Sequence, residues 1–559
     1  MLRLAYPVLF SLLLIVTALG LLVALLPALG YFPAIGGTEL TFNHWQQLAL
    51  VPGIGHSIQV SLLAGLVTPV ISLAAVFLFL ASASGGRLDS WIRRLASPVL
   101  AVPHAAAAFG LAFLIAPSGF LFRLVSPVPS GWERAPDLLI VNDSWGLSMI
   151  TGLILKEIPF LLLMALAALP QLNPGERVRM ARSLGYSPVI AWLKVVAPGL
   201  YPLLRLPLFA VIAFASATVD VAIILGPTLP PTLSVMLLSW FNDPDLQQRF
   251  LAGTAAMLQL ALSLGAIGTW LLGERLIARL YHFWVARGTR SRGEWLLHLL
   301  GRTVLPLALG TMIISLIILL VHSLSGLWQF PAALPADWSL HAWQRALPGF
   351  WQPLRNTLLI AAATTAFSLL LVVSALEHEF RQGRQQTTSA WILYVPLITP
   401  QVAFLFGLVV IAESLHLQPG IGLVMLAHLL FILPYTYLTL AGPYRHLDPR
   451  WLQMAASLGV TPGRSFWRIR LPLLLAPLLT SAAIGMAISV SLFLPTQMAG
   501  AGRVATVTTE AVALASGGNA SIIAVWAVLQ TLVPMLGFLI ALMIPRLVWR
   551  KRQGMQDLH

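Results

Sequence analysis

A few ionisable side chains interrupt the long apolar runs of this sequence, and they are the residues best able to do chemistry. Lys156 and Glu157 are adjacent in the apolar run 144–169, and Asp220 lies late in the run 199–225. Charged groups are costly inside a membrane and often mark pathways for polar solutes. The alternative is that each charge pairs with a neighbouring helix for packing alone. Adjacent helical residues point about 100° apart, so Lys156 and Glu157 are not expected to pair simply with each other.

Two further polar residues occupy matching positions after prolines. His104 follows Pro103, and Gln401 follows Pro400. If each proline kinks its helix, the polar side chains that follow could be exposed on opposite sides of a common axis, where they would line a pore. Alternatively, these side chains satisfy the backbone carbonyls that the prolines leave free. The candidate pathway residues are therefore His104, Lys156, Glu157, Asp220 and Gln401.

The residues that several kinds of enzyme need are missing. With no cysteine in the chain, disulfides, thiolate metal sites and thiol nucleophiles are excluded. The 12 histidines and 19 acidic residues show no metal-ligand spacing. A nucleotide-binding P-loop needs a lysine directly after a glycine, and none of the three lysines (Lys156, Lys194 and Lys551) has that neighbour. We therefore predict no catalytic residues, no metal and no cofactor.

The composition indicates the elements that must position these residues. Of 559 residues, 58% are hydrophobic and only 9% are charged, which is typical of a polytopic membrane protein in a lipid bilayer. We predict an all-α fold, because twelve apolar segments are long enough to cross the membrane as helices. They are 6–29, 57–81, 96–116, 144–169, 199–225, 251–274, 303–323, 356–376, 391–413, 421–442, 474–498 and 519–545.

The basic residues predict the orientation of these spans. Of 33 Lys and Arg residues, six fall in one set of alternate connecting segments and two fall within spans, so 25 lie in the other set. Cytoplasmic segments carry the excess of Lys and Arg, so both termini are predicted to be cytoplasmic. The net charge of +14 is spread over these short segments and does not form a nucleic-acid-binding face.

One cytoplasmic segment occurs twice, once in each half of the chain. Ala181, Leu184 and Gly185 recur with the same spacing as Ala455, Leu458 and Gly459, and a proline stands at the same position after each glycine. Six spans per copy is an even number, so the two copies enter the membrane in the same sense, as a parallel repeat. We expect a first transmembrane domain at 1–290 and a second at 291–559.

Each duplicated loop is predicted to be a short helix, a glycine turn and a second helical segment. Gly185 and Gly459 suit a helix end that needs a left-handed residue, and Pro188 and Pro462 suit the start of the next helix. An isolated loop of this kind would be an ordinary connector. Its recurrence at the same depth favours docking to a partner.

The loop resembles the "EAA" loop of binding-protein-dependent ABC importer permeases, E-A-A-x₃-G-x₉-I-x-L-P. Ile469, Leu471 and Pro472 match that pattern after Gly459. Arg179 and Gln453 replace the usual glutamate, and Met180 and Met454 replace the alanine that follows it. Over both halves, the chain is similar to the fused double permeases of ferric-iron and thiamine importers.

The resemblance implies a permease subunit of the bacterial inner membrane, with each loop seated in a cytoplasmic ABC ATPase subunit. Two ATPase copies and a periplasmic solute-binding protein are the implied partners, and nucleotide would be hydrolysed on the ATPase. The implied coupling residues are Arg179, Met180, Ala181, Leu184, Gly185, Pro188, Gln453, Met454, Ala455, Leu458, Gly459 and Pro462. The alternatives are an ion-coupled secondary transporter with a 6+6 parallel repeat and an integral membrane enzyme. The transported solute is left open.

Overall fold

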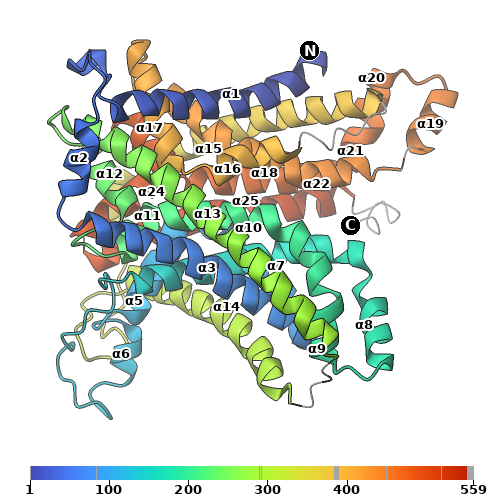
Figure 1. Ribbon diagram of the computed structural model, residues 1–559, viewed down its shortest axis with the longest axis horizontal. Coiled ribbons are helices and arrows are strands. Elements are labelled where there is room, and N and C mark those ends of the chain that lie inside the picture. Colours follow the sequence, from blue (N-terminus) through green and yellow to red (C-terminus); the bar gives the residue numbers. More distant parts are fainter. Residues whose placement is uncertain are drawn as a thin grey trace.

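The protein is all-helical in the computed structural model, which describes residues 2–83, 85–288, 290, 293–382, 390–448, 450–517 and 519–549. Its long helices run roughly along the long axis of the molecule (Figure 1). Ten helices in the described residues are long and apolar enough to cross a membrane, or up to twelve if two bent pairs each count as one span. Each of the twelve predicted spans overlaps one of these segments. Lys551 lies outside the described residues.

Six principal helices come from each half of the chain. The first half supplies α1 (Leu2–Ala28), α3 (Ile54–Ala83), α5 (His104–Ile115), α7 (Leu147–Ala168), α10 (Ala197–Ala217) and α13 (Gln248–Ala286). The second half supplies α14 (Trp295–Ser323), α15 (His341–Gln382), α17 (Gln401–Ser414), α18 (Ile421–Arg445), α22 (Leu475–Ser491) and α25 (Ala520–Val548).

Shorter helices cap both ends of the bundle and join the spans. In the first half they are α2 (Asn43–Leu50), α4 (Arg87–Ala101), α6 (Phe120–Leu124), α8 (Pro174–Ser183), α9 (Pro188–Val195), α11 (Asp220–Leu225) and α12 (Leu233–Phe241). In the second half they are α16 (Val395–Ile398), α19 (Arg450–Ser457), α20 (Pro462–Ser465), α21 (Leu471–Leu473), α23 (Phe493–Gly500) and α24 (Val507–Ala513). Single turns are η1 (Pro33–Ile35), η2 (Leu169–Leu172), η3 (Ala390–Tyr394), the π-helical η4 (Phe466–Arg470) and η5 (Leu514–Ser516).

The first helix of each half packs against the other half. Helix α1 packs on α17 and α15, whereas α14 packs on α3 and α5. Small residues permit both crossings: a Cβ at Gly407 would overlap the carbonyl oxygen of Gly20, and a Cβ at Gly110 would lie 2.9 Å from that of Ser315. Close backbone approach at small residues is typical of helix packing in membranes. The two halves are therefore interleaved in space. The division into two domains at 290/291 stays a prediction.

Four helix breaks occur at positions that correspond between the halves. Helix α4 ends before Pro103 and α5 starts after it, so the segment expected as one span at 96–116 is two helices. The corresponding break at Pro400 bends its helix pair by 89°. The fifth span of each half is also interrupted, at Thr218–Val219 between α10 and α11 and at Leu492 between α22 and α23. Broken helices in a membrane are tolerated where they are covered by protein or line a cavity.

Candidate functional site

A cavity of about 270 Å³ lies between the two halves, and the four helix breaks surround it. Its lining includes all five residues proposed from the sequence for the pathway: His104, Lys156, Glu157, Asp220 and Gln401. Two of the breaks lie at prolines, and the other two lie at Thr218–Val219 and at Leu492. Each break frees backbone groups where a solute could be held. The structure therefore brings these five residues together, and their role in transport stays a prediction.

The two walls of the cavity differ in chemistry. The first half supplies its charged side chains, Lys156, Glu157 and Asp220. The facing wall from the second half has Phe431 and Leu494 at the positions that correspond to Lys156 and Asp220. Aromatic rings from both halves complete the lining: Phe160, Phe214, Phe431, Tyr435, Phe493 and Phe538. The charged groups of the cavity thus come from the first half, whereas the second half contributes uncharged polar groups, such as Gln401, beside its apolar side chains.

Lys156 is held by the end of a neighbouring helix. Its Nζ donates to the carbonyl oxygens of Leu100 at 2.8 Å and Val99 at 3.4 Å, and the side chain is buried. These carbonyls belong to the last turn of α4: the Val99 carbonyl also accepts from the N–H of Val102, and Pro103 has no N–H with which to continue the helix. A cation also compensates the negative end of a helix dipole. The packing interpretation therefore has direct structural support for this residue.

The carboxylates make different contacts. Glu157 Oε1 lies 3.6 Å from His104 Nε2, and the His104 ring lies 4.7 Å from that of Phe214, centroid to centroid. Asp220 accepts a hydrogen bond of 3.2 Å from the Thr218 hydroxyl. Both carboxylates are buried. As the sequence predicted, Lys156 and Glu157 make separate contacts and no hydrogen bond joins their side chains.

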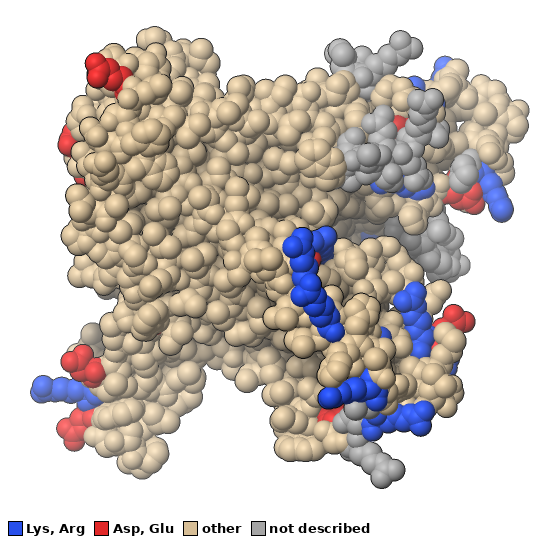
Figure 2. Space-filling view, in the orientation of Figure 1, with Lys and Arg blue, Asp and Glu red and all other residues tan. Residues whose placement is uncertain are grey.

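The two duplicated loops lie at one end of the molecule, which we call the loop end (the end that carries α8, α9, α19 and α20; Figure 1). On the face drawn in Figure 2, most Lys and Arg atoms also lie towards this end. The φ angle is 86° at Gly185 and 76° at Gly459, so each glycine adopts the left-handed conformation expected after a helix. Helices α9 and α20 then begin at Pro188 and Pro462.

Equivalent side chains of the two loops have the same environment. Ala181 and Ala455 are buried within each loop. The apolar side chains beside them are exposed: Met180 is 62%, Leu184 62%, Met454 50% and Leu458 82% exposed. Arg179 and Gln453, at the glutamate position of the pattern, are exposed too. An exposed methionine and leucine in each loop form an apolar patch of the kind that marks a protein interface.

The first loop also contacts the segment between the two halves. Glu294 accepts a hydrogen bond of 2.5 Å from the Ser187 hydroxyl and one of 3.3 Å from the Ile190 N–H. Lys194 Nζ lies 4.6 Å from the ring centroid of Trp284, near the end of α13. The connection between the halves is therefore attached to the first loop.

Sequence reasoning missed several cavity residues. Tyr435 and Phe160 line the cavity and each follows a proline, Pro434 and Pro159, at matching positions. That shared dipeptide was visible as a mark of the repeat but carried no signal of cavity lining. Ser491 precedes the break at Leu492, which no local pattern announced because the run 474–498 is continuously apolar.

Comparison with known proteins agrees with this architecture. Residues 376–549 match the family model described as "Binding-protein-dependent transport system inner membrane component". The chain is 29% identical over 523 residues to the inner membrane ABC transporter permease protein YnjC of Escherichia coli (strain K12), covering 92% of this chain and 93% of that protein. It is 30% identical over 183 residues to the molybdenum transport system permease protein ModB of Mycobacterium tuberculosis, covering 29% of this chain and 66% of that protein. Over 185 residues it is 26% identical to the spermidine/putrescine transport system permease protein PotC homolog of Mycoplasma genitalium, covering 32% and 65% respectively.

Proposed function

We propose, from the premise that this chain belongs to the binding-protein-dependent ABC transporter permeases, that it supplies both halves of the pathway of one importer. The loop end would face the cytoplasm with both termini on that side, in the bacterial inner membrane. Two ATPase subunits would each bind one duplicated loop, and ATP would be hydrolysed on those subunits. Closure of the ATPases would then switch access to the cavity between the two sides of the membrane.

One observation carries this proposal: two loops of the same conformation expose the same apolar pair at the same end of the molecule. Their left-handed glycines, their buried alanines and their exposed Met and Leu side chains correspond one to one. A single chain with two such loops is suited to bind a pair of like subunits, because each loop presents one equivalent surface. An ion-coupled transporter binds no ATPase subunits, so its mechanism would not require two such loops.

We infer that the cargo is a small polar solute delivered by a periplasmic binding protein. Relatives are named for molybdenum and for spermidine or putrescine, which differ in charge, so their names do not fix the solute. The cavity supports a solute with hydrogen-bonding groups, because its first-half wall is ionic. The binding protein would meet the end opposite the loops. There Arg123 joins both halves by donating to the carbonyls of Gln329 and Ala332 at 3.0 Å.

Co-purification from membranes tests the central part of the proposal. The full chain should retain its partner ABC ATPase, and vanadate-trapped nucleotide should strengthen the complex. Replacing both loop glycines, as Gly185→Gln with Gly459→Gln, should release the ATPase, because a side chain at these positive φ angles distorts both loops. Unchanged ATPase retention by the double variant would contradict the coupling-loop assignment.

A further inference from the structure

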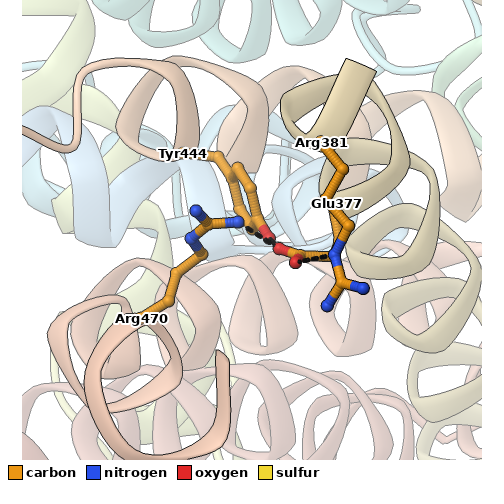
Figure 3. Close-up of polar contacts among 4 residues, drawn as sticks. All are labelled: Glu377, Arg381, Tyr444 and Arg470. Carbon is orange, nitrogen blue, oxygen red and sulfur yellow. Dashed lines mark hydrogen bonds and ion pairs between the residues drawn. The ribbon is translucent and has the colours of Figure 1, made fainter. Parts of the chain in front are cut away.

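Two glutamates in the last turns of α15, Glu377 and Glu379, are buried among arginines and tyrosines. Figure 3 shows the contacts of Glu377. The Glu377 carboxylate accepts from Arg381 Nε at 2.6 Å and from the Tyr444 hydroxyl at 2.5 Å, and it also accepts from Arg470 Nη1. The guanidinium of Arg470 lies 3.6 Å from the centroid of the Phe380 ring. Three charged or hydroxyl donors therefore meet one carboxylate from three separate segments.

The second glutamate repeats the arrangement close by on the same helix. Arg445 Nη2 donates to the two oxygens of Glu379 at 2.9 and 3.2 Å. It also donates to the Tyr437 hydroxyl at 3.2 Å, and that hydroxyl lies 3.4 Å from Glu379. Contacts of this kind to charged groups are stronger and more directional than neutral hydrogen bonds.

The two arginines occupy opposite ends of the second duplicated loop. Arg445 is the last residue of α18, immediately before the loop, and Arg470 is the last residue of η4, which directly follows α20. We call Glu377, Glu379, Arg445 and Arg470 the clasp. Because both glutamates belong to α15, the clasp fastens both ends of this loop to one transmembrane helix.

The first half replaces the clasp arginines by uncharged residues. At the spacing that relates Gly185 to Gly459, Val196 stands in the place of Arg470. At the spacing that relates the span prolines Pro159 and Pro434, Pro170 stands in the place of Arg445. Val196 is fully buried. The first loop packs on α3 through the rings of Phe77 and Trp192, whose centroids lie 5.6 Å apart.

Helix α3 likewise offers no carboxylate there. One constant spacing relates three buried hydroxyl residues of α3 to three of α15, namely Ser61 to Thr357, Thr68 to Thr364 and Ser72 to Ser368. At that same spacing Glu377 corresponds to Ala81 and Glu379 to Ala83. The clasp is therefore a feature of the second half, and apolar packing takes its place in the first.

We propose that the clasp residues are positioning residues that make the second loop and α15 move as one body. A buried ion pair resists separation, because pulling it apart leaves uncompensated charges in an apolar setting. Apolar and aromatic contacts lack this directional restraint and permit small sliding. An ATPase that pulls on the second loop would thus move α15 directly, whereas movement of the first loop reaches α3 through packing. The direction of this transmission rests on the proposed function.

Spin labels can test the clasp, because the chain has no native cysteine. Cysteines replace Trp451 on α19 and Leu370 on α15, both exposed, and the distance between their labels is measured by double electron–electron resonance on the full chain in nanodiscs. We expect one narrow distance distribution in the parent. In the variant that combines Glu377→Gln with Glu379→Gln, we expect this distance distribution to become broad. The matched control is Glu413→Gln, which breaks the 2.7 Å ion pair with Arg249 away from the loop and should leave the distribution narrow.

An equally narrow distribution in the Glu377→Gln, Glu379→Gln variant would overturn the clasp. If that variant fails to insert, Arg470→Lys keeps the charge and most of the volume but loses the planar fork, and it should broaden the distribution by less. No broadening in Arg470→Lys would then count against the proposal. These measurements on the chain alone need no ATPase, so failure to bind an ATPase contradicts the proposed function without affecting the clasp. With the ATPase bound, ATP and vanadate should leave the distance between the α15 and α19 labels of the parent unchanged, because the two segments move together.

Discussion

At the scale of single residues, the charged side chains of the cavity fall into two groups: one supports the end of a neighbouring helix, and the other contacts further residues of the cavity lining. The hydrogen bonds of Lys156 run to the carbonyls of Val99 and Leu100, so this charge completes the end of α4. Glu157 and Asp220 instead contact His104 and Thr218, which line the cavity with them. The sequence identified all of these ionisable residues, because charges are conspicuous in apolar runs. It could not separate the two roles, because Lys156 and Glu157 find their partners in segments that lie far away along the chain.

Replacing Lys156 by methionine tests the supporting role. The Lys156→Met variant should be less stable by about 1–3 kcal/mol, because the Leu100 carbonyl loses its donor and the Val99 carbonyl keeps only the Val102 N–H. Its midpoint of thermal unfolding in detergent should fall. The control Ser491→Ala removes a cavity hydroxyl that bonds within its own helix, to the carbonyl of Ala487, and should leave the midpoint almost unchanged. An unchanged midpoint for Lys156→Met would contradict the supporting role of Lys156.

At the scale of elements, the repeat was predictable and its spatial consequences were not. Each of the twelve apolar segments overlaps a candidate span of the structure, since lipid demands long apolar helices, but hydropathy did not reveal the breaks within them. In the sequence, Gly407 in Phe406-Gly407-Leu408 indicated only that the segment is repeated. The structure shows that Gly407 lies where α17 crosses α1. Which helix packs on which depends on surfaces far apart in sequence, so no local pattern reveals the exchange of α1 and α14.

Alanine substitutions test the α1–α17 crossing. Gly407→Ala should destabilise the protein by about 1–3 kcal/mol, because the added methyl group meets the backbone of α1. Gly442→Ala is the matched control in α18, where a Cβ would have no neighbour within 4 Å. That control should be neutral or stabilising by up to about 1 kcal/mol. Equal unfolding midpoints for the two variants would contradict the close crossing.

The exposed leucines of the duplicated loops make a second prediction for elements. Leu184→Ser and Leu458→Ser should each weaken ATPase binding by more than about 1 kcal/mol, a cost that only a minority of the residues in an interface reach. Their exposure means that the stability of the isolated permease should not change. Binding is measured by titrating purified ATPase onto the permease in nanodiscs. Leu139→Ser, also at an exposed leucine but in the connection between α6 and α7, is the control, and equal affinities for all three variants would contradict docking.

At the scale of the whole molecule, a central cavity lies between interleaved halves, and two loops are exposed at one end. The loops attach differently: the first contacts the segment between the halves through Glu294, and the second is held by the clasp on α15. The sequence predicted the symmetric part of this arrangement, because duplication preserves spacing. The asymmetric part arises from single substitutions, such as Val196 against Arg470, whose partners lie on distant helices.

The account as a whole predicts that ATP hydrolysis on a bound partner moves the cavity between the two sides of the membrane. A single cysteine in place of Ser491, in an otherwise cysteine-free chain, reports this movement through a membrane-impermeant thiol reagent added to either side of sealed vesicles. With the ATPase bound, ATP and vanadate should change the side from which this cysteine is labelled, and a hydrolysis-dead ATPase should fail to cycle it back. A change of side that needs no ATPase and disappears with a proton uncoupler would contradict the account.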